Sequence, residues 1–482
     1  MDLETPYNYQ LTGADYLAAH PQAFLADDMG LGKSCQAVVA SDILGLDRIL
    51  VLCPGSVRVN WEREFQKFSP MDRPCRVLLT GEDSIPTSGV VICSYDLLVA
   101  PTSSKAEKRA KKAPEDPLLK AKAKAARHLK AKRQAFLHAI QAIRWDVLIL
   151  DEAQYLKDRG AGRTTAVFGR NINDLGIAGN VERIWRLSGT PAPNNVSELW
   201  IHLRSAGIIT MGYYDFVSRY CVCVEGKFDV KIVGVKNVDE LKALLAQFML
   251  RRMKADVQND LPPIRFEEVA VEASPVLLDA SWAPGAAEEI RVGEQTLSQA
   301  LKAIGSSPDG ALGLLQTEGV AMATLRRFTG LAKLPGALAI IKEELESGQL
   351  DKIVLFGIHQ TVIEEAQKAL AKFGAVSVYG KTPGPQRQKN IDRFSQDPVC
   401  RVLIGNITAA GVGVNGMQDS CSEVGLLESS WVPADNEQAW SRVHRNGQSK
   451  SVRVRFFSLH RSSDEQVNTA LIRKTRDLAK IF

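Results

Sequence analysis

The sequence of 482 residues lacks the features that mark membrane, secreted and repeat proteins. It has no run of about 18 apolar residues, which is the length needed to cross a bilayer. Its first ten residues lack the apolar core of a secretory signal, so we expect neither a membrane span nor export. No repeat at a solenoid period is visible. A hydrophobic fraction of 45% and this length are typical of a globular protein with two or three domains.

Cysteine and histidine are present but follow no ligand pattern. The eight cysteines are scattered without a C-x-x-C pair, and the spacing of Cys221 and Cys223 does not suit a zinc knuckle. The seven histidines also form no such pattern. The sequence therefore argues against a disulfide framework and a zinc-stabilised fold, and it favours buried thiols in a reducing compartment.

The positive charge is concentrated in one segment. Residues 101–140 carry twelve Lys or Arg against three Asp or Glu, whereas the whole chain has a net charge of only +5. A local excess of this size invites a polyanion such as a nucleic-acid backbone. A solvated surface loop is an equally weighted alternative, because lysine clusters also simply solubilise a protein. The stretch Leu118–Leu137 within it has the composition of a helix.

Two series of short β-branched runs alternate with longer amphipathic stretches. This alternation predicts an α/β fold with parallel sheets and right-handed crossovers. The strands predicted for the first sheet are Ala23–Ala26, Ile49–Cys53, Arg76–Thr80, Val90–Cys93, Asp146–Leu150 and Arg183–Leu187. The strands predicted for the second sheet are Lys352–Phe356, Ala375–Tyr379, Arg401–Gly405, Glu423–Leu427 and Val452–Phe457.

The two predicted sheets divide the chain into three parts. We expect an N-terminal domain over 1–262, interrupted by the basic insertion at about 101–137, and a C-terminal domain over 336–482. The intervening residues 263–335 contain Gly and Pro breakers between pieces that look helical. They predict a linker and a helical protrusion.

A glycine-rich turn follows the first predicted strand. Asp27–Ser34 separates that strand from the helical run Cys35–Ile43, which is the context that a phosphate-binding loop requires. Gly30 and Gly32 let the backbone approach a phosphate group. The N-terminus of the following helix adds the positive end of its dipole.

Two side chains at the end of this turn are suited to a nucleotide. Lys33 would reach the β- and γ-phosphates, and the Ser34 hydroxyl would ligate Mg²⁺. The strict G-x-x-x-x-G-K-[ST] pattern requires Gly at position 27, where this sequence has Asp. The turn alone is therefore a weak signal.

A second motif strengthens the first. The predicted strand Asp146–Leu150 ends in Asp151 and Glu152. Asp151 would hold Mg²⁺, and Glu152 would orient or deprotonate the attacking water. Two carboxylates at a strand end are more often solvated or a helix cap, but a phosphate loop upstream favours catalysis.

These two motifs resemble motifs I and II of superfamily-two helicases, specifically the Swi/Snf type of DNA translocase. Tyr9-Gln10 resembles the element that reads adenine ahead of motif I. Further segments resemble motifs Ia, Ib, III, the end-of-first-lobe signature, V and VI: Cys53–Phe65, Val91–Tyr95, Leu187–Pro191, Phe248–Arg252, Gly411–Asn415 and Gln438–Gln448. The resemblance spans nearly the whole chain except 101–137 and the weakly matched 265–320. The nearest branch is the compact annealing-helicase-like one.

The resemblance implies two RecA-like lobes and use of ATP and Mg²⁺. The implied catalytic residues are Lys33, Asp151, Glu152, Arg442 and Arg445, with both arginines reaching the γ-phosphate from the second lobe. The implied nucleotide-binding residues are Gln10, Asp28, Met29, Gly30, Gly32, Lys33, Ser34 and Gly413, and the implied metal ligands are Ser34 and Asp151. The residues implied in DNA contact or in coupling are Ser56, Ser94, Ser188, Thr190, Thr408 and Asn415.

Two positions depart from the family pattern, and one histidine stays open. Gln154 stands where many relatives have His, so we expect communication between motif II and the second lobe to be tuned differently. Asn446 replaces the usual Ile beside Arg445. His444 is either a contact on the ligand side or a packing residue.

The function implied is that of a DNA-dependent ATPase that translocates on double-stranded DNA and remodels DNA or protein–DNA complexes. We expect a monomer that contacts mainly the DNA backbone, with a possible protein partner for targeting. The bare motor suggests a bacterial or phage origin and a cytoplasmic location, or a nuclear one in a eukaryote. A strand-separating or RNA-directed helicase is the alternative within the superfamily. A non-hydrolysing nucleic-acid clamp is the alternative from another class, and the intact catalytic set argues against it.

Overall fold

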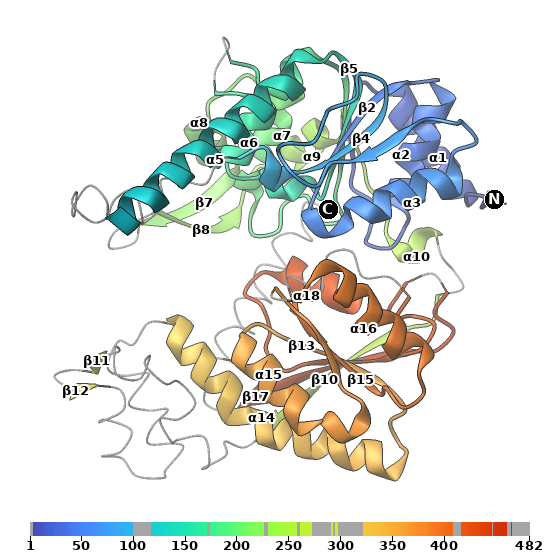
Figure 1. Cartoon of the computed structure of the whole chain (residues 1–482), viewed down its shortest axis with the longest axis vertical. Coiled ribbons are helices and arrows are strands. Elements are labelled where there is room, and N and C mark those ends of the chain that lie inside the picture. The colour runs from blue at the N-terminus through green and yellow to red at the C-terminus, as the bar shows by residue number, and fades with distance from the viewer. Residues whose placement is uncertain are drawn as a thin grey trace. The chain divides into compact units, whose positions relative to one another are not determined.

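The computed structural model describes residues 3–99, 117–170, 174–225, 230–257, 261–271, 291–292, 295–296, 322–380, 382–407, 416–445, 447–459 and 464. The chain divides into two compact units. The first, called here the first lobe, covers residues up to Asn259, and the second lobe covers Asp260–Arg476. Both are drawn in Figure 1.

The first lobe is built on a seven-stranded parallel sheet with the order β3-β4-β2-β5-β6-β1-β9. Its strands are β1 (Gln22–Leu25), β2 (Arg48–Cys53), β3 (Cys75–Val77), β4 (Gly89–Ser94), β5 (Trp145–Asp151), β6 (Val181–Leu187) and β9 (Met249–Leu250). All six strands predicted for this sheet are confirmed. The sequence analysis did not predict β9, which has only two residues.

Helices flank this sheet. They are α1 (Asn8–Ala19), α2 (Lys33–Ile43), α3 (Arg58–Phe68), α5 (Pro117–Ala142), α6 (Gly162–Phe168), α7 (Trp200–Ser205), α8 (Tyr213–Tyr220), α9 (Val238–Ala246) and α10 (Lys254–Val257). Short 3₁₀ turns follow several strands: η1 (Gly55–Val57), η2 (Tyr95–Leu97), η3 (Ala153–Leu156), η4 (Ile177–Asn180) and η5 (Val196–Leu199). Figure 1 shows α2 and α3 on one side of the sheet and α6 and α7 on the other.

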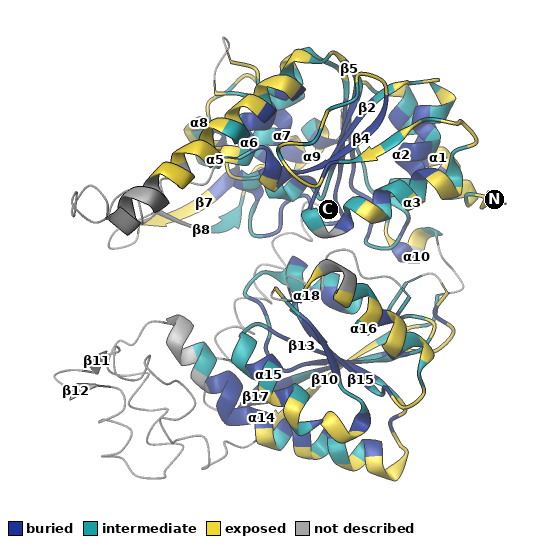
Figure 2. Ribbon diagram, viewed as in Figure 1, coloured by how far each residue is buried: buried dark blue, intermediate teal, exposed yellow. Residues whose placement is uncertain are grey.

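The central strands are apolar along their whole length because both of their faces are covered. Every residue of β4 is buried, as are the last five residues of β2 (Figure 2). A parallel sheet covered on both faces produces such continuous runs rather than an alternation of polar and apolar residues. The candidate functional residues, which are polar, are therefore expected in the loops at the carboxyl ends of the strands.

The second lobe carries a six-stranded parallel sheet with the order β10-β17-β16-β13-β15-β14. Its strands are β10 (Ile264–Val271), β13 (Ile353–Gly357), β14 (Val376–Val378), β15 (Val402–Asn406), β16 (Glu423–Leu426) and β17 (Val452–Leu459). Its helices are α14 (Met322–Ser347), α15 (Gln360–Ala369), η8 (Ala371–Phe373), α16 (Gly384–Gln396) and α18 (Pro433–Trp440). The five strands predicted for this sheet are confirmed.

The prediction of a linker over 263–335 is wrong at both of its ends. Its first residues form β10, which pairs with β17 over eight residues and is an edge strand with most of its side chains exposed. Its last residues belong to α14, which continues through Pro335. An exposed edge strand lacks the apolar run that identifies a buried strand, which is why the sequence did not predict β10.

Two more elements lie outside the sheets. The strands β7 (Cys221–Glu225) and β8 (Val230–Val235) form an antiparallel hairpin with a bulge, which the sequence analysis missed. The helix α5 confirms the helical reading of Leu118–Leu137, whereas residues 100–116 of the basic insertion lie outside the described residues. The short strands β11 (Arg291–Val292) and β12 (Gln295–Thr296) pair with each other. None of the described helices is long and apolar enough to span a membrane.

Candidate active site

The turn between β1 and α2 has the backbone that a phosphate loop requires. Gly30 has φ 86° and Gly32 has φ 70°, both in the left-handed region that favours glycine. A Cβ at position 32 would also lie 2.2 Å from Nε2 of Gln10. The left-handed backbone therefore favours glycine at position 32, and a larger residue would also displace the end of the Gln10 side chain.

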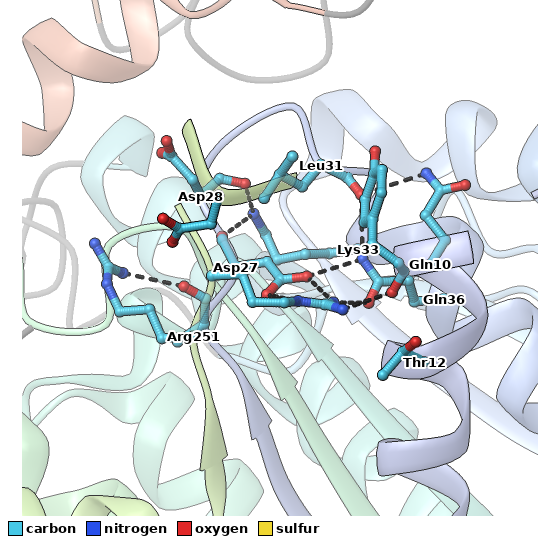
Figure 3. Close-up of polar contacts among 12 residues, drawn as sticks. Gln10, Thr12, Asp27, Asp28, Leu31, Lys33, Gln36 and Arg251 are labelled. Carbon is cyan, nitrogen blue, oxygen red and sulfur yellow. Dashed lines mark hydrogen bonds and ion pairs between the residues drawn. The ribbon is translucent and has the colours of Figure 1, made fainter. Parts of the chain in front are cut away.

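Lys33 is the first residue of α2, and its amino group folds back into the loop. Nζ donates to the backbone oxygen of Asp27 at 2.7 Å and to that of Asp28 at 3.0 Å (Figure 3). Burial lowers the pKa of Lys33, and the nearby carboxylate of Glu152 opposes this shift only in part. An amino group held by backbone oxygens keeps its charge available for phosphate oxygens.

The residue at position 27 explains why the loop departs from the strict pattern. Asp27 is fully buried and forms an ion pair with Arg252, whose Nε donates to Oδ1 at 2.9 Å. Gln36 completes the network: its Nε2 donates to Oδ2 of Asp27 at 3.0 Å, and its Oε1 accepts from Arg252 at 2.8 Å. The first position of the loop is thus a structural anchor. The sequence analysis singled out Asp27 and the segment ending at Arg252 separately and did not pair them.

The segment after β9 contacts the residue before the loop and motif III through Arg251. Pairing of β9 with β1 places Arg251 beside the loop, where its Nη1 donates to the backbone oxygens of Ala26 at 3.0 Å and Gly189 at 3.2 Å. A Cβ at Gly189 would lie 2.6 Å from Cγ of Met29 and 3.4 Å from Nζ of Lys33. Motif III therefore packs directly on the phosphate loop, and only glycine leaves room for this contact.

Gln10 links α1 to the same loop. Its Oε1 accepts from the backbone N–H of Tyr7 at 2.9 Å, and its Nε2 donates to the oxygen of Leu31 at 3.3 Å. The rings of Tyr7 and Tyr9 stack with centroids 5.8 Å apart, and the Arg252 guanidinium lies 5.7 Å from the Tyr9 ring. The predicted adenine-reading element therefore lies against the phosphate loop.

Asp151 ends β5 and is held from three directions. Trp61 Nε1 donates to its Oδ2 at 2.8 Å, the backbone N–H of Glu152 donates to its Oδ1 at 3.0 Å, and Tyr95 donates to its backbone oxygen at 2.8 Å. Burial, together with the charge of Glu152, raises the pKa of Asp151 to about 7. Because its ionised form is disfavoured in this way, the Asp151 carboxylate would be strongly stabilised by a cation bound beside it.

Glu152 begins a line of hydrogen bonds that runs into motif III. Its backbone is left-handed with φ 50°, an uncommon conformation for a residue with a side chain. Gln154 Nε2 donates to Oε2 of Glu152 at 2.7 Å, and the Ser188 hydroxyl donates to Oε1 of Gln154 at 2.6 Å. The backbone N–H of Thr190 then donates to the Ser188 hydroxyl at 3.0 Å. Gln154, the departure from the family pattern, is thus the middle of this line, inside the first lobe.

The donor set at Asp151 suits Mg²⁺ better than zinc. Among the described residues, no group of three or more His, Cys, Asp or Glu gathers to hold a metal. A metal beside Asp151 would therefore take its other oxygens from Ser34, water and phosphate, as Mg²⁺ usually does. All eight cysteines are free thiols, as expected from their spacing.

The residues implied in DNA contact are only partly placed. Ser94 ends β4 and is 4% exposed. Ser188 is buried at the end of β6 beside Thr190. Ser56 lies in η1, where its side chain is outside the description. Thr408, Gly413 and Asn415 lie outside the described residues.

In the second lobe, Arg442 and Arg445 lie on a turn that follows α18, and both are partly exposed. Gln448 anchors this turn, because its Nε2 donates to the backbone oxygens of Gln418, Cys421 and Val443 at 3.0, 2.9 and 3.2 Å. A ring nitrogen of His444 lies 2.8 Å from the oxygen of Pro262, on the chain that enters β10. This contact favours the packing role for His444. Asn446 lies outside the described residues.

A charged cluster in the second lobe was missed. Glu428 is buried just beyond β16, and its Oε2 accepts from the backbone N–H groups of Ile358 at 2.7 Å and His359 at 2.8 Å. A ring nitrogen of His359 lies 2.6 Å from Oε1. Burial opposes ionisation, but the contacts with His359 outweigh it and hold the pKa of Glu428 below its usual range. The signal in the sequence was a lone Glu directly after a buried strand.

Residues 9–276 match the SNF2-related domain family, and residues 336–447 match the helicase conserved C-terminal domain family. A relative in Caenorhabditis elegans, named "SWI/SNF-related matrix-associated actin-dependent regulator of chromatin subfamily A-like protein 1 homolog", is 27% identical over 481 residues. That match covers 96% of this chain and 60% of the relative. The mouse protein named "DNA annealing helicase and endonuclease ZRANB3" is 26% identical, over 94% of this chain and 38% of its own length. This chain thus spans about half the length of such relatives.

A solved structure is also similar. It is named "Sulfolobus solfataricus SWI2/SNF2 ATPase core in complex with dsDNA". Its sequence is 21% identical, the TM-score is 0.40, and the match covers 100% of this chain and 99% of the other.

Proposed function

The chain belongs to the SNF2-related family of helicase-like ATPases, and from this premise we propose that it hydrolyses ATP when bound to double-stranded DNA and moves along the duplex. The observation that carries the proposal lies in the first lobe. The Lys33 amino group is held in a glycine loop whose neighbours include the charges of Asp151 and Glu152. This is the set of groups that phosphoryl transfer to water requires.

ATP would bind across the loop between β1 and α2. Gly30 and Gly32 expose backbone N–H groups to the phosphates, and Lys33 would exchange its contacts with backbone oxygens for contacts with phosphate oxygens. Asp28 and Met29 belong to the same loop, and Gln10 with the stacked tyrosines would face the base. Ser34 and Asp151 would hold Mg²⁺, which neutralises charge on the phosphates.

Glu152 is the residue proposed to orient and deprotonate the attacking water. Its carboxylate receives a hydrogen bond from Gln154, which fixes where the charge points. The same amide contacts Ser188, so a change at Glu152 during hydrolysis reaches motif III through one side chain. We propose that this line reports the state of the nucleotide to residues that contact DNA.

Arg442 and Arg445 are proposed to reach the γ-phosphate when the lobes close. Their fixed charge and forked geometry match phosphate oxygens, and such a finger is worth about 10³–10⁵ in rate in comparable hydrolases. Hydrolysis would then depend on closure. Cycles of closing and opening would carry the lobes along the DNA, with Ser56, Ser94, Thr408 and Asn415 among the backbone contacts.

The biological task is proposed to be the remodelling of DNA or of protein–DNA complexes. The names of the relatives, a regulator of chromatin and a DNA annealing helicase, point in this direction. The matched part covers 96% and 94% of this chain and 60% and 38% of these relatives. Targeting would rest on a protein partner, and the motor itself would act as a monomer.

The test is phosphate release by the purified chain without nucleic acid and with plain duplex, fork, single-stranded DNA and RNA. We expect the largest stimulation with DNA that contains a duplex. Stimulation by RNA alone would establish the RNA-directed alternative, and strand separation on a fork would establish a true helicase. Release that no nucleic acid stimulates would reject the proposal and favour a clamp.

Two variants tie the activity to the site. Lys33→Ala should abolish hydrolysis. Glu152→Gln should keep ATP binding while kcat falls by about 10²–10⁴, the range that a general base contributes. Glu182→Gln is the matched control, since Glu182 is half-exposed and its one ion pair among the described residues is with the surface Arg144. Full turnover by Glu152→Gln would remove that residue from the proposed role.

A further inference from the structure

The helix α5 has two halves with different surroundings. Its C-terminal half is anchored in the first lobe: Phe136 is 4% exposed, Ile140 is fully buried, and Nη1 of Arg133 donates to the oxygen of Asp96 at 2.9 Å. In its N-terminal half, the consecutive residues Arg127–Ala131 are all exposed. Five consecutive residues cover every side of a helix, so residues 127–131 pack little on the rest of the lobe, and Figure 2 shows α5 mostly exposed along this stretch.

The charge of α5 has one sign. Its 26 residues contain seven Lys or Arg and no Asp or Glu. Within the described part of the chain, α5 makes one ion pair, between Lys132 and Glu82 in the anchored half. Lys124, Arg127 and Lys130 in the N-terminal half have no carboxylate partner among the described residues.

The N-terminal half is therefore a helix that its own lobe does little to stabilise. Ala, Leu, Lys and Arg have high helix propensity, which keeps the segment helical. Like charges three or four residues apart oppose this, at about 0.2–0.5 kcal/mol per pair. A helix that is polar on all sides is otherwise stabilised by i,i+4 ion pairs, and α5 contains no acidic residue with which to form them. A polyanion along it would both add contacts and relieve the repulsion.

We infer that the N-terminal half of α5 binds the phosphate backbone of double-stranded DNA, as a second contact outside the motifs at the carboxyl edge of the sheet. The choice of DNA rests on the proposed function, whereas the choice of a polyanion rests on the charge. Residues 117–131 have a rise of about 22 Å, comparable with about six base-pair steps. Lys124, Arg127 and Lys130 follow one another every three residues, with the small side chains of Ala125 and Ala131 between and beside them.

A duplex fits this surface better than a single strand or an acidic protein. Binding of single strands uses aromatic side chains on which the bases stack, and residues 117–131 contain no Phe, Tyr or Trp. Protein interfaces are depleted in lysine and need an apolar centre, whereas Leu129 is the only large apolar side chain among the residues of α5 that the structure describes as exposed. Backbone binding needs only the charges.

The test compares two triple variants of the full chain. K124Q/R127Q/K130Q removes the proposed contacts, and R144Q/R170Q/K242Q removes three exposed cations elsewhere on the first lobe. Binding of a blunt 30-base-pair duplex is measured by fluorescence anisotropy over a salt series. Each lost phosphate contact lowers the salt slope by about 0.9, so we expect a loss of about two to three in the first variant, with affinity at low salt reduced about tenfold or more. The control variant should keep the wild-type slope.

Two further measurements separate this inference from the function and from misfolding. Hydrogen exchange of wild-type amides in residues 124–131 should slow with the duplex, and should slow less with a single strand or with polyglutamate. At saturating duplex, the first variant should reach the wild-type kcat for ATP, because only binding is weakened. If DNA does not stimulate hydrolysis but the triple variant still has a smaller salt slope than the wild type, the proposed function is rejected and the proposed DNA contact of α5 is kept.

Equal slopes in the two variants, or unchanged exchange in α5, would overturn the inference. Equal protection by polyglutamate and duplex would overturn it in favour of an acidic protein partner. Stronger protection by the single strand would overturn the choice of a duplex.

Discussion

The carboxyl edges of the two sheets hold their functional side chains in different ways. In the first lobe, these side chains contact one another or the loop backbone: Asp151 is held by Trp61, and Glu152 by Gln154. In the second lobe, the turn that carries Arg442 and Arg445 is anchored through a neighbour, Gln448. The comparison teaches that the groups proposed to grip the nucleotide throughout the cycle belong to a network of hydrogen bonds within the first lobe. The groups proposed to act after closure lie on a turn whose backbone Gln448 supports.

The largest expected effect is the loss of turnover when an arginine of the second lobe is removed. Arg445→Ala should lower kcat for DNA-stimulated hydrolysis by about 10³ or more while ATP affinity changes little, because a finger acts mainly on the transition state. Steady-state phosphate release and binding of a fluorescent nucleotide measure the two quantities. Lys450→Ala, which removes an exposed cation from the same lobe, is the control. An unchanged kcat in Arg445→Ala would exclude that residue as a finger.

The next effect concerns the anchor beneath the loop. Arg252→Met should lower the free energy of unfolding by about 3–5 kcal/mol, since it leaves the buried Asp27 carboxylate without its partner. Urea denaturation measures this loss. Arg219→Met breaks the half-exposed pair with Glu240 in the same lobe and should cost far less stability, because surface ion pairs are screened by solvent. If the free energy of unfolding falls equally in the two variants, the buried pair of Asp27 and Arg252 contributes no more to stability than a surface pair.

A smaller effect makes the first lobe sensitive to mild acid. His202 is fully buried, and burial together with the charge of Arg186 lowers its pKa to about 3. The unfolded state takes up a proton near pH 6.5 and the folded state does not, so stability falls as the pH drops below 6.5. Between pH 8 and pH 5 the loss attributable to His202 is about 2 kcal/mol. His202→Leu should remove this part of the pH dependence in urea titrations at pH 8 and pH 5.

The second lobe offers the contrast in the same experiment. The pKa of Glu428 is held below its usual range, so its contribution to stability is still complete at pH 5 and is lost only at lower pH. A His202→Leu variant that keeps the wild-type slope would show that the acid sensitivity arises elsewhere.

The smallest expected effect concerns the hydrogen bonds that connect Glu152, Gln154 and Ser188. Gln154→Ala should lower kcat by up to about tenfold, which corresponds to the loss of one or two hydrogen bonds. Ser188→Ala should have a similar effect, and the double variant should be no worse than either, because both act through one connection. Additive losses in the double variant would mean that the two residues act independently. Phosphate release at saturating DNA is the measurement.

Most of the fold was predictable because buried parallel strands are continuous apolar runs. All eleven predicted strands exist, and the two sheets are separate units. The failures have separate physical causes. In β10, the residues Arg265, Glu267 and Glu268 are those of an exposed edge, so no local pattern marks the strand. In α14, Pro335 lies inside the helix, where its sequence context predicts a boundary.

In the candidate site, the residues of each motif were predictable and their partners were not. The loop glycines have the expected left-handed backbone, and Asp151 ends the expected strand. The hydrogen bond from Trp61 to Asp151 joins residues 90 positions apart, and the pair of Arg252 with Asp27 spans 225 positions. Such contacts follow from the strand order, with β9 beside β1, and a single sequence does not contain that order.

The line from Glu152 to Thr190 has a direction. Because the Gln154 amide gives its N–H to the carboxylate, its oxygen must face Ser188, and the Ser188 hydroxyl must then point its proton toward Gln154 and its lone pairs toward Thr190. Gln154 and Ser188 do not titrate, so neither changes its bonding with pH. A proton arriving on Glu152 would remove the negative charge that fixes the amide. The hydrogen bond between Gln154 and Glu152 would then weaken, and the amide would be held less firmly toward Ser188.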